Sequence, residues 1–434
     1  MSFEEAQAHL DALGIDAMKS LVPSLHRMES ICEALDHPER SVPAIHVTGT
    51  NGKTSTARIA ASVLSATGLS VGTYTSPHLE TVRERIARDG DPISEAEFSD
   101  VFDHLKPYIE VVEKQLDERL SYFETLTAMF FLWAAEAPVD AMVVEVGLGG
   151  LWDATNVVPA PVAVLTNVGL DHTGLLGMER TTIAREKAGI VKHRAEVVTA
   201  EVDPSVLSVI EEAAGAADAA LSRFGREFHI TDNRTAFGGR YLSVSTSARD
   251  YAGLFLPLHG SHQGVNAATA LESVVRFVPR GSLDDDVVIE GLGAAQAPGR
   301  LEVLRPDASG GPTVVLDVAH NPDGMAALVA SLLEEFAFDR TVFVIGILHD
   351  KDYRGMLAEL ARVPSTVIAT QAKSMRSVSP AELGAVCHEM GLDCEVSDDA
   401  SAAVRTAVQT AAPGDLVCVT GSHYVVGEIR SFLL

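Results

Sequence analysis

Residues 46–60, HVTGTNGKTSTARIA, join an apolar, β-rich run to a helix-forming run through a turn that holds two glycines. Glycines let backbone N–H groups turn toward one point, and a helix N-terminus adds partial positive charge there. Lys53 adds a full positive charge, and the Thr54 hydroxyl is placed to reach a Mg²⁺ ion. The pattern predicts a phosphate-binding loop in an α/β fold. The alternative is a plain glycine turn with an exposed lysine.

The rest of the chain alternates strand-like and helical runs, which predicts a mostly parallel sheet with helices on both faces. The strands expected in this first region are 44–48, 70–75, 141–146, 162–166 and 196–199, and its main helices are 54–67, 95–116 and 123–136. Residues 240–258 differ, because YLSVSTS and YAGLFLPL predict a small antiparallel pair appended to that domain. Two further helices are expected at 262–277 and 286–295.

A second domain is predicted after GAAQAPGRLE, residues 293–302, where glycines and a proline lie close together. The alternation then restarts, with strands expected at 313–317, 341–345, 366–369 and 416–420. This pattern predicts a second, smaller, Rossmann-like sheet. The predicted domains are residues 1–297 and 298–434.

Composition excludes several classes of function. The formal net charge of −27 argues against nonspecific binding to nucleic acid or to an anionic membrane. No apolar run reaches the ~18 residues of a membrane span, and the N-terminus lacks the pattern of a signal peptide. The cysteines, Cys32, Cys387, Cys394 and Cys418, have no Cys-x-x-Cys spacing, so we expect free, mostly buried thiols in a cytoplasmic protein.

Polar residues follow two of the expected strands of the first sheet. Glu145 ends the strand in AMVVEVGLGG, and Asp171 and His172 follow the strand in VAVLTNVGLDH. Ligands of open α/β sheets bind at this rim, and hard oxygen donors beside a phosphate loop favour Mg²⁺ over zinc. The alternatives are an ion pair for Glu145 and a packing or capping role for His172.

Four other residues have a plain or a functional interpretation. Lys187, in AREKAGIVK, is on its own most simply a solvated lysine. Beside Mg²⁺ its pKa would fall, and the neutral amine could take up CO₂ as a carbamate, an anionic metal ligand. In the second sheet, Asp317 could hold a ribose hydroxyl and Arg300 could reach a nucleotide, while Asn321 could be merely a helix cap.

Motifs in order along the chain resemble one known family. They are TGTNGKTS, YTSPHL, RERI, YFETLTA, VVEVGLGG with DATN, LTNVGLDHTGLLG, EKAGI, LHGSHQGVNAATA, PGRLE and DVAHNP. Together these blocks resemble the folylpolyglutamate synthase/dihydrofolate synthase family, which is related to the Mur ligases. The resemblance implies a Mur-ligase-like P-loop domain with a small appended sheet, a Rossmann-like C-terminal domain, and ATP bound between them.

The resemblance also implies residue roles. Nucleotide contacts would come from Asn51, Gly52, Lys53, Thr54, Asn266, Arg300 and Asp317. Metal ligands for two Mg²⁺ ions would be Ser76, Glu145, His172 and a carbamylated Lys187, and the catalytic residues would be Lys53, His172 and Lys187. The pterin pocket would contain Tyr122, Phe123, Glu124, Thr125, Trp152, Asp153 and Ala154.

The implied reaction is ATP-driven addition of L-glutamate to dihydropteroate, to a folate, or to both, by a monomeric enzyme through an acyl phosphate. Two positions depart from the family's pattern: Thr54 stands where many members carry glycine, and Leu151 stands where arginine is usual. The alternatives are a Mur-type ligase acting on a nucleotide-linked peptidoglycan precursor and a regulatory ATPase that makes no bond. The motifs YTSPHL, YFETLTA and DATN favour the folate reaction over both.

Overall fold

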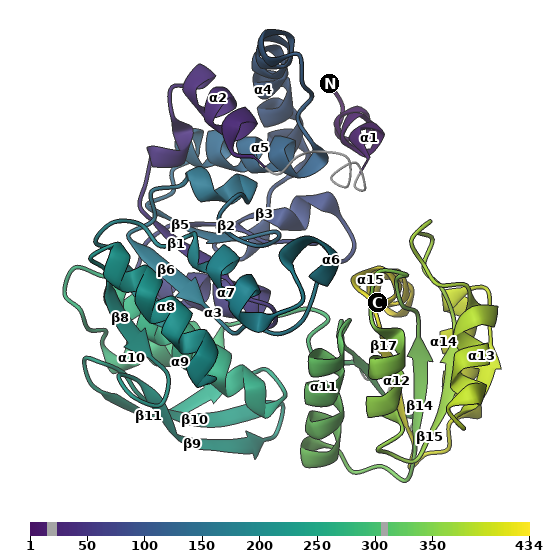
Figure 1. Ribbon diagram of the computed structural model, residues 1–434. Coiled ribbons are helices and arrows are strands. Elements are labelled where there is room, and N and C mark those ends of the chain that lie inside the picture. The colour runs from purple at the N-terminus through teal and green to yellow at the C-terminus, as the bar shows by residue number, and fades with distance from the viewer. Residues whose placement is uncertain (15–23, 305–310) are drawn as a thin grey trace. The chain divides into compact units, whose positions relative to one another are not determined.

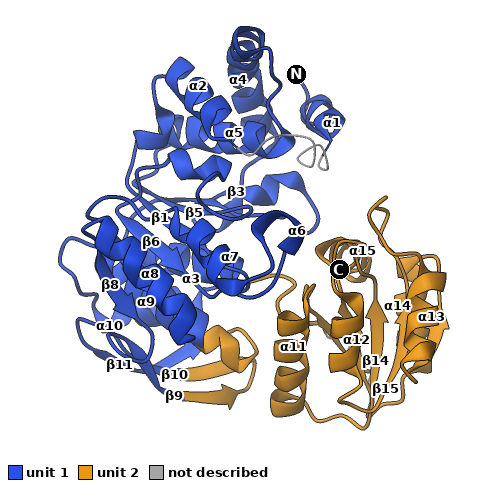
Figure 2. Cartoon of the chain, in the orientation of Figure 1, with its two compact units in different colours: residues 1–232, 242–255, 265–296 blue, residues 233–241, 256–264, 297–434 orange. Residues whose placement is uncertain are grey.

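The computed structural model describes residues 1–14, 24–304 and 311–434 (Figure 1). The chain divides into two compact units. The first contains residues 1–232, 242–255 and 265–296, and the second contains residues 233–241, 256–264 and 297–434 (Figure 2). The domains predicted from the sequence, 1–297 and 298–434, stay a prediction.

The first unit is built on an eight-stranded sheet with strand order β4-β3-β2-β5-β1-β6-β7-β8. Six strands run parallel, and β3 and β4 are antiparallel additions at one edge. The strands are β1 (Ala44–Thr48), β2 (Val71–Tyr74), β3 (Ile86–Arg88), β4 (Asp91–Pro92), β5 (Ala141–Glu145), β6 (Val162–Leu165), β7 (Glu196–Thr199) and β8 (Ala220–Arg223). Strand β1 lies inside the sheet and all five of its residues are buried, which explains its apolar composition.

Helices cover both faces of this sheet (Figure 1). The helices of this part of the chain are α1 (Phe3–Leu13), α2 (His26–Ala34), α3 (Lys53–Ala66), α4 (Glu95–Leu116), α5 (Tyr122–Glu136), α6 (Thr173–Leu176), α7 (Arg180–Ala188), α8 (Pro204–Ala216), α9 (Ser261–Phe277) and α10 (Asp285–Gly293). Helix α5 is buried at every residue from Tyr122 to Ala134, because it packs between the sheet and helices α1, α2 and α4. A helix buried on all sides is apolar around its whole circumference, which accounts for the sequence AMFFLWAA.

A separate sheet contains three strands, in the order β11-β10-β9. They are β9 (His229–Ala236), β10 (Gly239–Ser245) and β11 (Asp250–Leu256). The pair expected at residues 240–258 corresponds to β10 and β11, and β9 was missed. None of the eight side chains of β9 is buried, so its sequence, HITDNRTA, carries no apolar alternation that could predict a strand.

The second unit contains a six-stranded sheet with strand order β12-β13-β17-β14-β15-β16. Five strands are parallel, and β12 pairs antiparallel with β13, so the sheet is mixed. The strands are β12 (Glu302–Leu304), β13 (Thr313–Leu316), β14 (Thr341–Ile345), β15 (Ser365–Ala369), β16 (Asp393–Val396) and β17 (Leu416–Thr420). The helices are α11 (Pro322–Glu335), α12 (Tyr353–Leu360), α13 (Pro380–Glu389), α14 (Ala400–Thr410) and α15 (His423–Leu433).

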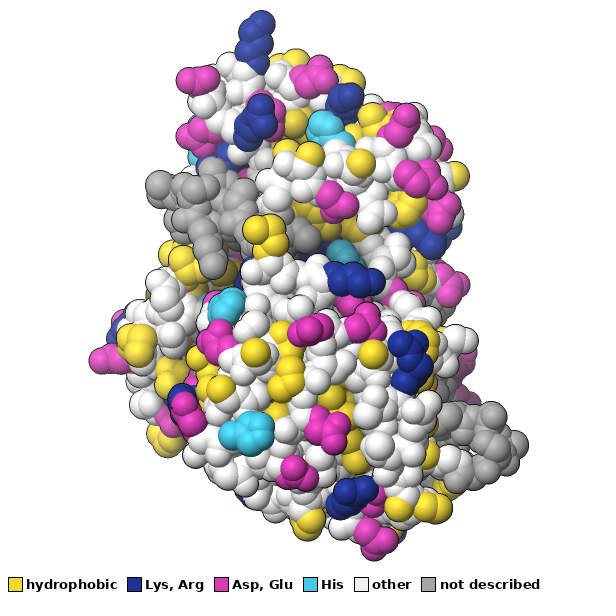
Figure 3. Space-filling model, turned by 90° about the vertical axis from the view of Figure 1, so that its right-hand side faces the viewer, with side chains coloured by type: hydrophobic (Ala, Val, Ile, Leu, Met, Phe, Trp, Pro, Cys, Tyr) yellow, Lys and Arg dark blue, Asp and Glu magenta, His cyan; other side chains and the backbone are white. Residues whose placement is uncertain are grey.

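Two expectations from composition can be compared with the structure. The four cysteines are free thiols and all are buried, as predicted. Among the described residues, no helix is both long enough and apolar enough to cross a membrane. On the face shown in Figure 3, carboxylate side chains are spread among Lys and Arg side chains rather than gathered in one patch.

Candidate active site

The phosphate loop predicted at residues 49–54 connects β1 to α3, and α3 begins at Lys53. Gly49 and Gly52 have positive φ angles of 150° and 82°. The backbone N–H of Asn51 donates to the Oδ1 atom of Asn167 over 2.9 Å. Sequence reasoning missed Asn167, because its contact with the loop joins residues far apart in the chain and leaves no local pattern.

Gly52 brings Asn266 of α9 to the loop. A Cβ atom placed on Gly52 would lie 2.5 Å from the Oδ1 atom of Asn266, closer than real Cβ contacts allow. Position 52 therefore requires glycine for two reasons: its left-handed φ and the close approach of Asn266. Asn266, predicted as a nucleotide contact, lies directly against the phosphate loop.

We expect Gly52→Ala to weaken ATP binding about tenfold or more, since the left-handed backbone and the displaced Asn266 together would strain the loop by roughly 1–2 kcal/mol or more. Titration of a fluorescent ATP analogue measures the effect. Gly68→Ala is the matched control, because Gly68 also has a positive φ, of 90°, but nothing lies within 4 Å of its missing Cβ. Equal ATP affinities in the two variants would contradict the close-packing argument.

Two lysines meet at the carbonyl of Gly49. The Nζ atom of Lys53 donates to the Gly49 and Thr50 carbonyls, each over 3.1 Å. The Nζ atom of Lys187, on α7, donates to the same Gly49 oxygen over 2.7 Å. Lys187 is buried, so it is not the solvated lysine that the local sequence suggests. Burial, together with the positive charge of Lys53, lowers the pKa of Lys187 to about 7.

Glu145 lies at the carboxyl end of β5 and is 1% exposed. Its Oε1 atom accepts a hydrogen bond from the Thr54 hydroxyl over 2.9 Å, and its Oε2 atom accepts one from the Ser76 backbone N–H over 3.0 Å. One carboxylate thus connects the phosphate loop, strand β5 and the YTSPHL segment. Three residues predicted to bind Mg²⁺ or phosphate are in contact here.

The Glu145 carboxylate and the Thr54 hydroxyl fit Mg²⁺, because both are hard oxygen ligands of the kind that this ion prefers. Within the described residues, no group of three or more His, Cys, Asp or Glu side chains could hold a metal ion. A Mg²⁺ ion held by a single carboxylate takes its remaining ligands from water and from nucleotide phosphates. The donor set therefore suits a metal that arrives with ATP.

His172 is placed at the N-terminal end of α6. Its φ angle is 50°, its backbone N–H donates to Asp171 Oδ1 over 2.8 Å, and its ring Nε2 lies 4.0 Å from the same oxygen. The side chain is about one third exposed, with a relative exposure of 35%. The negative charge of Asp171 opposes the effect of burial by raising the pKa of Lys187. The metal-binding role of His172 stays a prediction.

The two segments predicted to form the pterin pocket converge on residues 147–148. The ring of Phe123, in the first turn of α5, lies over Gly147, where an added Cβ would approach it to 2.4 Å. The buried carboxylate of Asp153 accepts the backbone N–H of Leu148 through Oδ2, over 2.9 Å. Burial raises the pKa of Asp153. The structure therefore brings together an aromatic ring and a carboxylate that the sequence separates by 30 residues.

Other predicted pocket residues have structural partners. Glu124 accepts hydrogen bonds from Arg27 Nε over 2.9 and 3.2 Å and from the Ser121 backbone N–H over 2.8 Å, so it caps α5 and holds α2. Thr125 is buried and donates to the Ser121 carbonyl over 3.0 Å. Trp152 is partly buried beside the apolar cluster of α7 and α8. Contacts of these residues with a substrate stay predictions, as do those of Tyr122 and Ala154.

Two predicted nucleotide contacts belong to the second unit. Asp317 is buried and accepts the backbone N–H groups of Leu301 and Ala319 over 2.9 and 2.8 Å, and burial raises its pKa. An Nη2 atom of Arg300 lies 3.2 Å from the ring Nε2 of His423. Asn321 caps α11 by accepting the Gly324 N–H, as its capping interpretation predicts.

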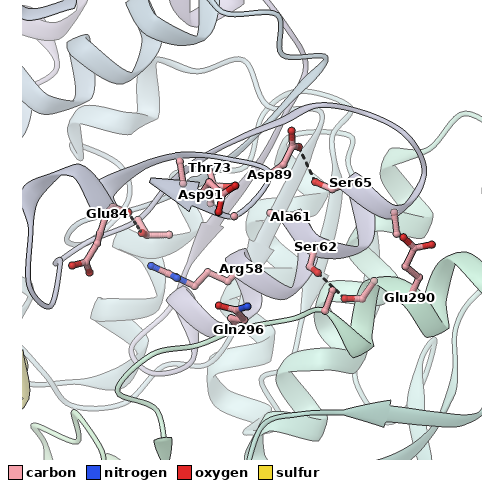
Figure 4. Close-up of a pocket in the computed structure, with 16 residues that line it drawn as sticks. Arg58, Ala61, Ser62, Ser65, Thr73, Glu84, Asp89, Asp91, Glu290 and Gln296 are labelled. Atoms are coloured by element: carbon pink, nitrogen blue, oxygen red, sulfur yellow. Dashed lines mark hydrogen bonds between the residues drawn. The ribbon is translucent and has the colours of Figure 1, made fainter. Parts of the chain in front are cut away.

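A pocket of about 280 Å³ lies elsewhere in the first unit, between α3, the β2–β4 edge and α10 (Figure 4). Its sixteen lining residues include Arg58, Thr73 and Glu290, but none of the residues predicted for the site. Sequence reasoning missed it because small and polar residues of three distant segments form its wall.

Comparisons with known proteins agree with this geometry. The Mur ligase middle domain matches residues 47–274, and the Mur ligase glutamate ligase domain matches residues 299–423. A dihydrofolate synthase/folylpolyglutamate synthase of Mycobacterium tuberculosis is 41% identical over 372 residues, which cover 82% of this chain and 76% of that protein. The chain belongs to the dihydrofolate synthase/folylpolyglutamate synthase family.

Other members of the dihydrofolate synthase/folylpolyglutamate synthase family match over nearly their full length. The Bacillus subtilis protein is 33% identical, with 95% of each chain covered. A folylpolyglutamate synthase of M. tuberculosis, solved in complex with ADP, superimposes with a TM-score of 0.93 at 37% identity, covering 99% of this chain and 98% of that one. An FPGS–AMPPCP–folate complex, in which FPGS stands for folylpolyglutamate synthase, gives a TM-score of 0.87 at 31% identity, with both chains fully covered. The family resemblance and the fold class inferred from the sequence are confirmed.

Proposed function

We propose that this protein is an ATP-dependent ligase that joins L-glutamate to dihydropteroate, to a reduced folate, or to both. The observation that carries the proposal is the phosphate loop with Lys53 at its helix end and Glu145 fixed to Thr54 and Ser76. Family membership supports it, and so does the AMPPCP and folate bound by a structurally similar protein.

The chemistry explains why such a site needs ATP. A carboxylate does not react with an amine at neutral pH, because its oxygen is a poor leaving group. The carboxylate of the acceptor attacks the γ-phosphorus of ATP and displaces ADP, which gives an acyl phosphate. The amine of glutamate then attacks the acyl carbon and displaces phosphate, forming the amide. The loop N–H groups and Lys53 orient the phosphates and stabilise their charge.

Glu145, Thr54 and Ser76 would hold one Mg²⁺ ion, and His172 with a carbamylated Lys187 would hold a second. Bound Mg²⁺ neutralises phosphate charge in reactions of this kind. The low pKa of Lys187, about 7, leaves much of its amine neutral at physiological pH, and a neutral amine is the form that takes up CO₂. A mass increase of one CO₂ on Lys187, seen in native mass spectra, tests the carbamate.

The acceptor would bind beside Phe123 and Asp153. A flat pterin ring stacks on an aromatic side chain, and its N–H groups find an acceptor in a buried carboxylate. Tyr122, Glu124, Thr125, Trp152 and Ala154 would complete the pocket, and Asn266, Arg300 and Asp317 would contact the nucleotide. We also propose a cytoplasmic monomer that uses no nucleic acid or membrane partner.

A mass-spectrometric assay tests this function directly. Purified protein with ATP, Mg²⁺ and L-glutamate is incubated with dihydropteroate or with tetrahydrofolate, and we expect one added glutamate residue on at least one of them. Omission of glutamate should abolish the product. Phosphate release that ignores both glutamate and acceptor would instead favour a regulatory ATPase, and activity only on a nucleotide-linked peptide precursor would favour a Mur-type reaction.

A further inference from the structure

A buried chain of hydrogen bonds runs from β1 to the Asp153 carboxylate. His46, three residues before Gly49, is fully buried, and its Nε2 atom lies 2.8 Å from the hydroxyl of Thr155. The Thr155 hydroxyl donates to the Oδ1 atom of Asp153 over 2.5 Å, and the Thr155 backbone N–H donates to the same oxygen over 3.0 Å. Thr155 is fully buried as well.

The hydrogen bonds of this buried chain run in one direction, from His46 through Thr155 to Asp153. A threonine hydroxyl carries a single proton, and here that proton goes to Asp153, so the hydroxyl oxygen accepts from His46. The ring of His46 must therefore carry its proton on Nε2. Burial, reinforced by the charge of Lys192, lowers the pKa of His46 to about 3, so the ring is neutral and this tautomer leaves Nδ1 as an acceptor. That Nδ1 atom is buried and has no hydrogen-bond partner in the described part of the chain.

Stability alone gives little reason for a histidine at this position. One net hydrogen bond contributes about 1 kcal/mol, whereas a buried polar atom left without a partner costs about 1–3 kcal/mol. An apolar side chain in β1 would avoid the unpaired Nδ1. What His46 supplies and an apolar residue cannot is the donor to Thr155.

The hydrogen-bond chain ends at Asp153, where the two predicted pocket segments converge. Asp153 Oδ1 receives two hydrogen bonds from Thr155, while Oδ2 receives the Leu148 N–H, so the carboxylate cannot rotate freely. Leu148 follows Gly147, against which the Phe123 ring packs. The orientation of Asp153 relative to that ring thus depends on a donor located on the strand that leads into the phosphate loop.

We propose that His46 is a positioning residue for the acceptor substrate: acting through the Thr155 hydroxyl, it fixes the Asp153 carboxylate in the orientation that receives the acceptor's N–H groups. This inference rests on the proposed function, since it takes Asp153 to be an acceptor contact. Strand β1 then has two roles. Its carboxyl end positions the phosphate loop, and His46, inside the strand, positions the acceptor pocket.

Steady-state kinetics of two His46 variants test the proposal. His46→Phe keeps a flat ring and removes the donor, so we expect the KM for the acceptor to rise about tenfold, the effect of losing roughly one hydrogen bond. The KM for ATP should stay within about twofold, since the loop contacts are untouched. His46→Gln, whose amide nitrogen can reach as far as Nε2, should restore most of the acceptor affinity. An equal rise in both KM values, or no rescue by glutamine, would overturn the proposal.

A double-mutant cycle with Thr155 shows whether His46 acts through it. Thr155→Val removes the hydroxyl at constant shape and should raise the acceptor KM, while Thr155→Ser keeps the hydroxyl and should not. Adding His46→Phe to Thr155→Val should change the acceptor KM little further, because the hydrogen-bond chain from His46 to Asp153 is already interrupted. Additive effects would mean that His46 acts independently of Thr155 and would refute the relay.

Asp153→Asn distinguishes failure of this inference from failure of the proposed function. If the unmodified protein forms no glutamylated product, the proposed function fails and the inference fails with it. If product forms but the asparagine variant keeps the normal acceptor KM, the inference alone is wrong. Circular dichroism and thermal melting of each variant confirm that the kinetic constants refer to folded protein.

Discussion

Lys53→Ala is expected to lower kcat for ligation at least ~10³-fold while the protein stays folded. A lysine that clamps a transferred phosphoryl group stabilises charge that develops in the transition state, and removing such a clamp costs several powers of ten. The amine of Lys53 is held at the phosphate loop by the Gly49 and Thr50 carbonyls. Single-turnover phosphate release measures the loss, and circular dichroism monitors the fold.

Two further variants separate charge from structure. Lys53→Gln can still donate to the loop carbonyls but carries no charge, so we expect it to be nearly as inactive as the alanine variant. Arg58→Ala removes a positive charge five residues further along the same helix, from a partly buried residue outside the loop, and should change kcat less than about threefold. A glutamine variant close to normal, or an arginine variant as poor as Lys53→Ala, would contradict the clamp.

Much of the site could be predicted because its residues stand at the ends of sheet strands. The apolar runs of β1 and β5 fix where each strand stops, and Gly49 and Glu145 come just there. Parallel strands end at one edge of a sheet, so residues distant in sequence meet without any need to know their contacts. The resemblance to a known family then supplied roles for residues, such as Ser76, that no local pattern singles out.

The rest depends on tertiary contacts that leave no periodic signal. The polar strand β9 pairs without an apolar face, and Asn167 binds the loop through one side-chain oxygen. Lys187 shows the same limit, because its local sequence is that of a surface helix, yet it is buried with its amine on the Gly49 carbonyl. His46 looks like an ordinary strand residue until its hydrogen bond to Thr155 is known.

Glu145→Gln is expected to lower turnover by ~10²–10³-fold and to raise the Mg²⁺ concentration needed for half-maximal activity at least ~10-fold. The substitution keeps the shape of the side chain but removes the charge, and an amide nitrogen would face either the Thr54 hydroxyl or the Ser76 N–H, which now donate to the two carboxylate oxygens. Activity measured against Mg²⁺ concentration, at saturating ATP, gives both quantities.

Glu201→Gln is the matched control, because Glu201 is also a buried carboxylate beyond a strand end of the same sheet. Its oxygens accept the Val168, Val202 and Asp203 N–H groups and lie 3.3 Å from Arg180, so its charge serves local structure. We expect this variant to melt at a lower temperature with an unchanged Mg²⁺ requirement, since the buried carboxylate of Glu201 loses its charge and its ion pair with the partly exposed Arg180, while no metal ligand is removed. If both variants shifted the Mg²⁺ requirement alike, general loss of buried charge would explain the effect, and Glu145 would not be a specific ligand of the metal.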